Sequence, residues 1–234
     1  IFEVGMDKKG EIDFLSKILK PNLGIITNIS YAHSKNFKNI NGIAEAKSEI
    51  IENIKLGGNI ILNEDDKFFK FLKRKAFLRN LKIYSFSLKN KKSYANFIKT
   101  IKIKDKFKIY FKINSLIQFY YSYNNSKNHI QNILATLTAI SIYFDLRKIS
   151  KNIFLDFKIP EGRGDTLKLN FRGKTINLVD ESYNSNPLSL KFALERYDSL
   201  YKKKSNKFLL IGEMLELGKF SKKLHIKIAK YINK

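Results

Sequence analysis

The stretch LGIITNI, residues 23–29, is an apolar run, and a second run, NIILN, follows at residues 59–63. Apolar runs of this length are typical of strands that are buried on both faces of a parallel sheet. Between the two runs, residues 42–55 carry apolar side chains at helical spacing, and Gly57-Gly58 ends that segment. A helix between two strands is the unit from which parallel sheets are built. The stretch therefore predicts an α/β protein with a mainly parallel sheet.

The same alternation extends over the rest of the chain, which has 234 residues. We expect further strands at 1–6, 82–87 and 208–214, hairpins within 93–124 and 166–180, and helices at 11–19, 66–79, 129–144, 149–157, 187–201 and after residue 214. The segment IPEGRGD contains one Pro and two Gly and predicts a joint between a domain at 1–158 and a domain at 159–234. Both ends of the chain fall inside predicted elements, so we expect a piece of a longer protein.

The composition is strongly basic, with a net charge of +24 and no Cys. The absence of Cys excludes disulfides and thiolate metal sites. Only six of the 45 basic residues are Arg, and the lysines are spread along almost every segment, which favours solvated faces and coding bias. A field that attracts polyanions is the alternative. No apolar run approaches the roughly 18 residues of a membrane span, so we expect no membrane insertion.

Lys47 stands where a helix at 42–55 would place an apolar residue. Ile43, Ile51 and Ile54 lie 4 residues before it, 4 after it and 7 after it, which puts Lys47 on the apolar stripe. A lysine there extends to solvent, pairs with an acid, or loses its charge. Carbamylation requires a neutral amine, which burial would supply.

Glu3 and His33 each come at the end of an expected strand. Ligand sites in open α/β sheets gather at the carboxyl edge of the strands. A carboxylate and an imidazole that converge there can bind a divalent metal. The alternative is that His33 is an ordinary loop residue.

Three further stretches of polar residues suit a nucleotide. Asn128 and Asn132 lie one turn apart at the start of a helix, where they can contact a flat heterocycle, although Asn128 can equally be an N-cap. Arg163 stands between two glycines, an arrangement that suits a phosphate or an interdomain ion pair. The loop DESYNSN, 180–186, has seven polar side chains in a row, more than a simple turn needs.

Several of these stretches together resemble the Mur ligase family, the ATP-dependent amide ligases of bacterial cell-wall precursor synthesis. EVGMDKKGEI (3–12), ITNISYAH (26–33) and GIAEAKSEI (42–50) are similar to the central ATPase domain of the family. EGRGD (161–165), DESYNSNP (180–187) and IGEMLELG (211–218) resemble the C-terminal domain of one member. The resemblance covers nearly the whole chain.

The resemblance implies a fold and a role for individual residues. The fold would be a P-loop-type central ATPase domain, truncated, followed by part of a Rossmann-like C-terminal domain. Lys47, carbamylated, and Arg163 would be catalytic. Glu3, His33 and Lys47 would hold Mg²⁺. The ATP-binding set would be Asn128, Asn132, Arg163, Glu181, Tyr183, Asn184 and Asn186, with Glu181 on the ribose, where relatives have Asp.

The implied activity is ATP-dependent addition of D-alanyl-D-alanine to UDP-N-acetylmuramoyl-tripeptide through an acyl phosphate. The implied cofactors are ATP and Mg²⁺, and the implied protein is a cytoplasmic monomer that binds no nucleic acid. The phosphate-binding loop of the family, GTNGKT-like, would precede Ile1, so we expect this chain alone to be inactive. Alternatives are a diamino-acid-adding or folylpolyglutamate-type ligase of the same superfamily and, from the basic hairpin at 99–113, a nucleic-acid-binding module.

Overall fold

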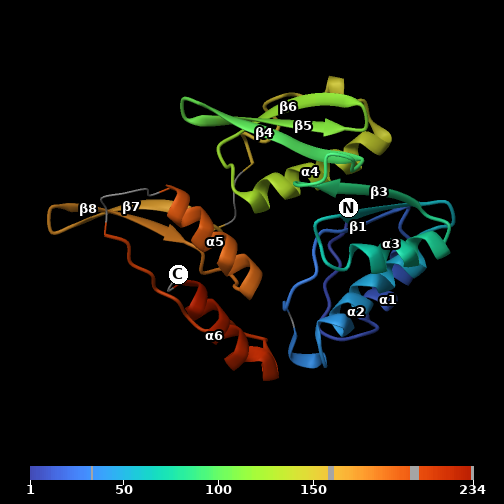
Figure 1. Ribbon diagram of the computed structural model, residues 1–234, viewed down its shortest axis with the longest axis horizontal. Coiled ribbons are helices and arrows are strands. Elements are labelled where there is room, and N and C mark those ends of the chain that lie inside the picture. The colour runs from blue at the N-terminus through green and yellow to red at the C-terminus, as the bar shows by residue number, and fades with distance from the viewer. Residues whose placement is uncertain (33, 158–160, 201–205, 233–234) are drawn as a thin grey trace. The chain divides into compact units, whose positions relative to one another are not determined.

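The computed structural model describes residues 1–32, 34–157, 161–200 and 206–232, leaving aside the side chains of residues 199 and 200 (Figure 1). The described chain forms two compact units. The first unit contains Ile1–Ile29 and Phe37–Phe157, and the second contains Ser30–Asn36 and the chain from Lys158 onward. The short segment Ser30–Asn36 thus groups with the C-terminal part of the chain, although it lies between two segments of the first unit.

A six-stranded sheet forms the centre of the first unit. Its strands follow one another in chain order. The pairs β1–β2, β2–β3 and β3–β4 are parallel, whereas the pairs β4–β5 and β5–β6 are antiparallel. The predicted α/β class with a mainly parallel sheet is therefore confirmed. The strands are β1 Leu23–Ile26, β2 Asn59–Asn63, β3 Lys82–Ser87, β4 Ala95–Ile103, β5 Lys106–Ile113 and β6 Leu116–Ser122.

Helices cover both faces of this sheet. They are α1 Glu11–Leu19, α2 Ile40–Asn53, α3 Phe69–Leu78 and α4 Lys127–Tyr143, with a 3₁₀ turn, η2, at Leu146–Lys148. Side chains of β2 alternate between the faces. Ile60 and Leu62 pack with α1, α2 and α3, whereas Ile61 packs with β5 and α4. Figure 1 shows the first three helices grouped together and α4 beside the antiparallel strands.

The second unit is built from a hairpin and two helices. The hairpin strands are β7 Asp165–Phe171 and β8 Lys174–Asp180, and the helices are α5 Pro187–Leu200 and α6 Ser221–Ile232, with 3₁₀ turns η1 at Ser34–Asn36 and η3 at Gly218–Phe220. A small core of Met214, Leu217, Leu224 and Ile228 includes the ring of Tyr31, which lies 5.4 Å from that of Phe220. Two hydrogen bonds add to this contact: Lys35 N donates to Glu216 O at 2.9 Å and Ser34 Oγ donates to Leu217 O at 3.3 Å.

Three predicted elements are wrong. Residues 1–6 and 208–214 form no strand, because no described strand pairs with them and a strand is stable only with a partner. Met6 instead packs into the helix-covered core, and Phe208 and Leu210 are exposed. Residues 149–157 form successive turns rather than a helix, because the carbonyl of Lys151 accepts a hydrogen bond from Tyr121 N at 2.8 Å, beside β6.

None of the helices within the described residues combines the length and apolar character that crossing a membrane requires.

Candidate functional site

Lys47 lies on the apolar side of α2, as its spacing predicts. Ile43 and Ile51 on the same helix are fully buried, and Lys47 itself is half-buried. Burial lowers the pKa of the Lys47 ammonium, because the charged form loses solvation, while the carboxylates of Asp66 and Glu3 act in the opposite direction. The lysine therefore stands in a sheltered place that two negative charges face.

Asp66 is a residue of this site that the sequence analysis missed. Its Oδ2 accepts a hydrogen bond from Ile29 N at 2.7 Å, and its Oδ1 accepts one from Phe68 N at 2.8 Å. The first bond joins the segment after β2 to the segment after β1, so that Asp66 lies at the carboxyl edge of the parallel strands. The acidic run EDD, directly after the apolar strand NIILN, was the available signal.

The other two acids of that run organise the same edge of the sheet. Glu64 accepts hydrogen bonds from Ser85 Oγ at 3.0 Å, Asn90 Nδ2 at 2.8 Å and Ser93 Oγ at 2.5 Å. Burial acts to raise the pKa of Glu64, but these hydrogen bonds outweigh it and bring the pKa below its ordinary value. Asp65 accepts from Ser87 Oγ at 2.6 Å. Glu64 and Asp65 thus tie β2 to β3 and to the loop before β4.

Two of the three predicted metal ligands, Glu3 and Lys47, lie among the described residues. Glu3 is exposed and contributes charge near Lys47, whereas His33 lies outside the described residues. Over residues 1–32, 34–157, 161–200 and 206–232, no three His, Asp or Glu side chains gather closely enough to hold a metal. The role of Glu3, His33 and Lys47 as metal ligands stays a prediction.

Asn128 and Asn132 lie in the first two turns of α4. Ser126 is the N-cap of this helix, since its Oγ accepts a hydrogen bond from His129 N at 3.4 Å. The N-cap alternative for Asn128 is therefore wrong. Asn132 is exposed, and Ala135, which follows it on the same face, is buried. A contact of either amide with adenine stays a prediction.

In the second unit, the EGRGD segment and the loop after β8 lie against each other. Tyr183 N donates to Gly162 O at 3.1 Å, and Gly164 N donates to Asp180 O at 2.6 Å. Both glycines have a positive φ, +72° and +102°, which a side chain would strain. The guanidinium carbon of Arg163 lies 4.3 Å from the centre of the Tyr183 ring. The structure thus places two predicted ATP-binding residues side by side.

The rest of the polar loop divides into exposed and structural residues. Tyr183 and Asn184 are exposed. Asn186 is different, because its Oδ1 accepts hydrogen bonds from Leu188 N at 3.0 Å and Ser189 N at 3.1 Å, which makes it the cap of α5. Asn186 therefore has a structural role in α5, and a contact of Asn186 with ATP stays a prediction.

Glu181 is paired with Arg196 of α5. Nη1 of Arg196 lies 3.4 Å from Oε1 of Glu181. Burial raises the pKa of Glu181, the charge of Arg196 and its hydrogen bond act to lower it, and the charges of Asp165 and Asp180 add to the rise. No pattern in the sequence links Glu181 to its partner, which is 15 residues away in the chain.

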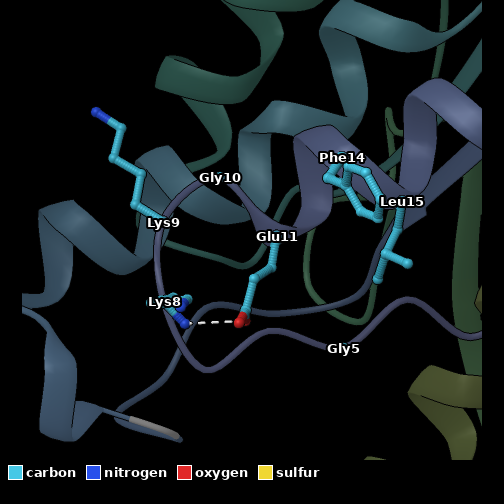
Figure 2. A pocket seen from close by; sticks show the side chains of 7 residues that line it. All are labelled: Gly5, Lys8, Lys9, Gly10, Glu11, Phe14 and Leu15. Carbon is cyan, nitrogen blue, oxygen red and sulfur yellow. Dashed lines mark hydrogen bonds between the residues drawn. The ribbon is translucent and has the colours of Figure 1, made fainter.

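An open pocket of about 640 Å³ lies near the start of the first unit, and none of the predicted site residues lines it (Figure 2). Glu11 shapes its wall by accepting a hydrogen bond from Lys8 N at 3.1 Å. Glu49 of α2 accepts hydrogen bonds from Gly10 N at 2.9 Å, which fixes the start of α1. The lining residues are Gly5, Lys8, Lys9, Gly10, Glu11, Phe14 and Leu15.

Comparison with known proteins identifies curated relatives and solved structures that are similar to this chain. The chain is 32% identical over 245 residues to the UDP-N-acetylmuramoyl-tripeptide–D-alanyl-D-alanine ligase of Rickettsia prowazekii, an alignment that covers 99% of this chain and 50% of that protein. A crystal structure of MurF from Acinetobacter baumannii matches with a TM-score of 0.83 and 24% identity, over 97% of this chain and 48% of that one. A crystal structure of MurF ligase from Thermotoga maritima in complex with ADP matches with a TM-score of 0.76 and 22% identity, over 99% and 51%.

The chain therefore spans about half the length of the relatives it matches. The sequence profile of the Mur ligase middle domain matches residues 1–140, which include β1, β2, α2 and the half-buried Lys47. This match extends over more than half of the chain, and it shows that the protein belongs to the Mur ligase family.

Proposed function

We propose that the chain is part of an ATP-dependent ligase that adds D-alanyl-D-alanine to UDP-N-acetylmuramoyl-tripeptide in peptidoglycan precursor synthesis. Residues 1–158 would be its central ATP-binding domain and residues 159–234 the first part of a Rossmann-like C-terminal domain. The relative from Rickettsia prowazekii carries the name of this activity. ATP and a UDP-linked precursor are made in the cytoplasm, and we place the ligase there as well. We also propose that it is a monomer.

The observation that carries the proposal is the environment of Lys47. A half-buried lysine with a lowered pKa is more readily neutral, and only a neutral amine can attack carbon dioxide to give a carbamate. The lysine lies on α2, beside the carboxyl edge of β1 and β2 that Asp66 marks, where α/β proteins bind their ligands. A surface lysine on a solvated helix face would have neither property.

The residues around Lys47 fit a divalent metal. Glu3 and Asp66 direct negative charge at Lys47, and a carbamate would add an oxygen donor of the kind that Mg²⁺ prefers. Glu3, His33 and the modified Lys47 would then hold the metal. When bound, Mg²⁺ would neutralise charge on the phosphoryl group that passes from ATP to the tripeptide carboxylate.

Residues of the second unit have a separate part in the proposal. Arg163 would bind the phosphates of ATP, and Glu181 would accept hydrogen bonds from the ribose hydroxyls. Tyr183 and Asn184 are exposed on the same loop, and the Tyr183 ring lies against the Arg163 guanidinium. Asn128, Asn132 and Asn186 complete the proposed nucleotide-binding set.

The alternatives gain less support. A diamino-acid-adding ligase would have a DYAHTP-like sequence at the position of SYNSNP, 182–187. In the basic hairpin that suggested nucleic-acid binding, two lysines lie over rings of the neighbouring strand β6, with Lys108 Nζ 3.8 Å from the Phe119 centroid and Lys106 Nζ 4.3 Å from that of Tyr121. These cation–π contacts account for lysines on an aromatic sheet face without a nucleic acid.

The test is Lys47→Ala in the whole ligase, with Lys55→Ala, an exposed lysine just after the same helix, as the matched control. We expect ligation to fall by at least about 100-fold for Lys47→Ala and to be partly restored by short carboxylic acids, which supply the missing oxygen donor. A carbamate signal from ¹³C-labelled bicarbonate should appear in the wild type and in Lys55→Ala and vanish in Lys47→Ala. Wild-type turnover by Lys47→Ala would refute the proposed role.

A further inference from the structure

Arg196 occupies the point where three segments of the second unit meet. It extends from α5 toward the loop after β8, and its Nη1 lies 3.4 Å from Oε1 of Glu181. The side chain of Arg196 is only 19% exposed, and that of Glu181 is 38% exposed. Most exposed ion pairs on a helix surface hold long side chains loosely. This one is formed by an arginine that is largely enclosed.

The third segment is EGRGD. A Cβ built on Gly164 would collide with Nη1 of Arg196 and would stand 3.0 Å from Oε1 of Glu181. Gly164 also has a φ of +102°. The absence of a side chain at this position therefore leaves the space that the ion pair fills, directly beside Arg163.

Charge around Glu181 explains why it needs a cationic partner. Asp180 precedes it in the chain, and Asp165 lies across the hairpin in register with Asp180. Both carboxylates oppose a negative charge on Glu181, and Arg196 is the group that counters them. Glu181 has one methylene more than Asp, and this extra torsion must be fixed before the carboxylate can present an oxygen in a defined direction.

We propose that Arg196 is a positioning residue that holds Oε1 of Glu181 and so directs the second oxygen, Oε2, at the ribose hydroxyls of the nucleotide. The inference rests on the proposed function, in which Glu181 contacts the ribose. Arg196 touches neither substrate nor nucleotide in this scheme. It acts through Glu181, and it holds that carboxylate in one orientation.

The test measures how strongly the whole ligase distinguishes ATP from 2′,3′-dideoxy-ATP, which lacks both ribose hydroxyls. The ratio of kcat/KM for the two nucleotides is compared in the wild type, Glu181→Gln, Arg196→Gln and the double variant. Loss of a hydrogen bond to a charged group should lower the ratio by about 10-fold in Glu181→Gln. We expect a fall of about 5- to 10-fold in Arg196→Gln and no further fall in the double variant, because the two residues act as a unit.

Two additional variants make the result specific. Arg196→Lys keeps the positive charge but loses the planar fork, so the ratio should fall by only about 3-fold. Lys191→Gln, on the same helix, removes an exposed lysine 3.9 Å from Glu195 and should leave the ratio unchanged. Calorimetric binding of both nucleotides without the peptide substrates gives the same ratio independently of turnover, and far-UV circular dichroism shows whether each variant is folded.

The outcomes separate the two hypotheses. If Glu181→Gln lowers the ratio and folded Arg196→Gln and Arg196→Lys both retain it, the positioning role of Arg196 is refuted while the ribose contact stands. If Glu181→Gln itself leaves the ratio unchanged, the ribose contact is wrong and the inference falls with it.

Discussion

Replacing Glu64 by Ala is expected to destabilise the first unit by about 2–4 kcal/mol. A hydrogen bond to a charged group contributes about 1.5–3 kcal/mol, and Glu64 accepts three, from Ser85, Asn90 and Ser93. The sum is an overestimate, because the three bonds share one carboxylate and the half-buried donors, Ser85 and Asn90, can turn to water. Ser93 cannot do so easily, since it is only 7% exposed and its 2.5 Å bond is the shortest of the three.

Urea unfolding at pH 7, followed by far-UV circular dichroism, measures this loss. Glu52→Ala is the matched control, because Glu52 forms longer ion pairs, at 3.6 Å from Lys75 Nζ and 3.6 Å from Arg79 Nε, and its side chain is 47% exposed. Exposed pairs of this kind contribute less than about 1 kcal/mol. Equal losses for Glu64→Ala and Glu52→Ala would refute the conclusion that the hydrogen bonds of Glu64 hold β2 to β3.

The loss of stability caused by Glu64→Ala should depend on pH in a defined direction. The pKa of Glu64 is below its ordinary value of 4.5 in the folded chain, so the folded state favours the ionised form. The stabilisation is therefore complete above the unfolded pKa and is lost as the pH falls through the folded pKa. The difference in the free energy of unfolding between wild type and Glu64→Ala should shrink on going from pH 7 to about pH 3. A difference that stays constant would contradict the lowered pKa.

Two further predictions concern local structure. Asn186→Ala removes the cap of α5 and should cost about 1 kcal/mol in urea unfolding, whereas Asn184→Ala, on the exposed part of the same loop, should cost almost nothing; equal effects would argue against the cap. Gly58→Ala should lower the midpoint of thermal unfolding, because a Cβ there would stand 2.7 Å from Lys55 O and 2.9 Å from Asn22 O, which are backbone atoms and cannot rotate away. An unchanged midpoint would show that the turn before β2 can adjust.

The fold could be predicted where a segment carries its own periodicity. The unit from β1 through α2 to β2 follows from two apolar runs and one helical stripe, and the same stripe singled out Lys47. Residues 1–6 and 208–214 carry an equally apolar pattern without becoming strands. Apolar composition is a property of the segment itself, whereas a strand also requires a partner, and no partner can be read from the segment alone.

Single residues of the candidate site could be predicted from the sequence, but the contacts between them could not. Lys47 is unusual for its position on an apolar helix stripe, so a local pattern identifies it, whereas the role of Glu181 came from the family resemblance. Asp66 and Arg196 look ordinary in the sequence, one in an acidic turn and one on a helix, and only their contacts with Ile29 N and Glu181 Oε1 give them a role. Contacts between residues 15 or 37 positions apart depend on tertiary structure, which no local pattern encodes.

The membership of Ser30–Asn36 in the second unit bears on how this protein can be divided for experiments. A fragment cut at the segment 159–165 would contain Leu217 and Phe220 but not the 30–36 segment that packs against them. It would lose the Tyr31 ring that lies beside Phe220. It would also lose the hydrogen bonds that Ser34 Oγ donates to Leu217 O and Lys35 N donates to Glu216 O. The C-terminal unit is thus discontinuous in the sequence, and a fragment for crystallography or isotope labelling needs the 30–36 peptide supplied in trans or fused to it.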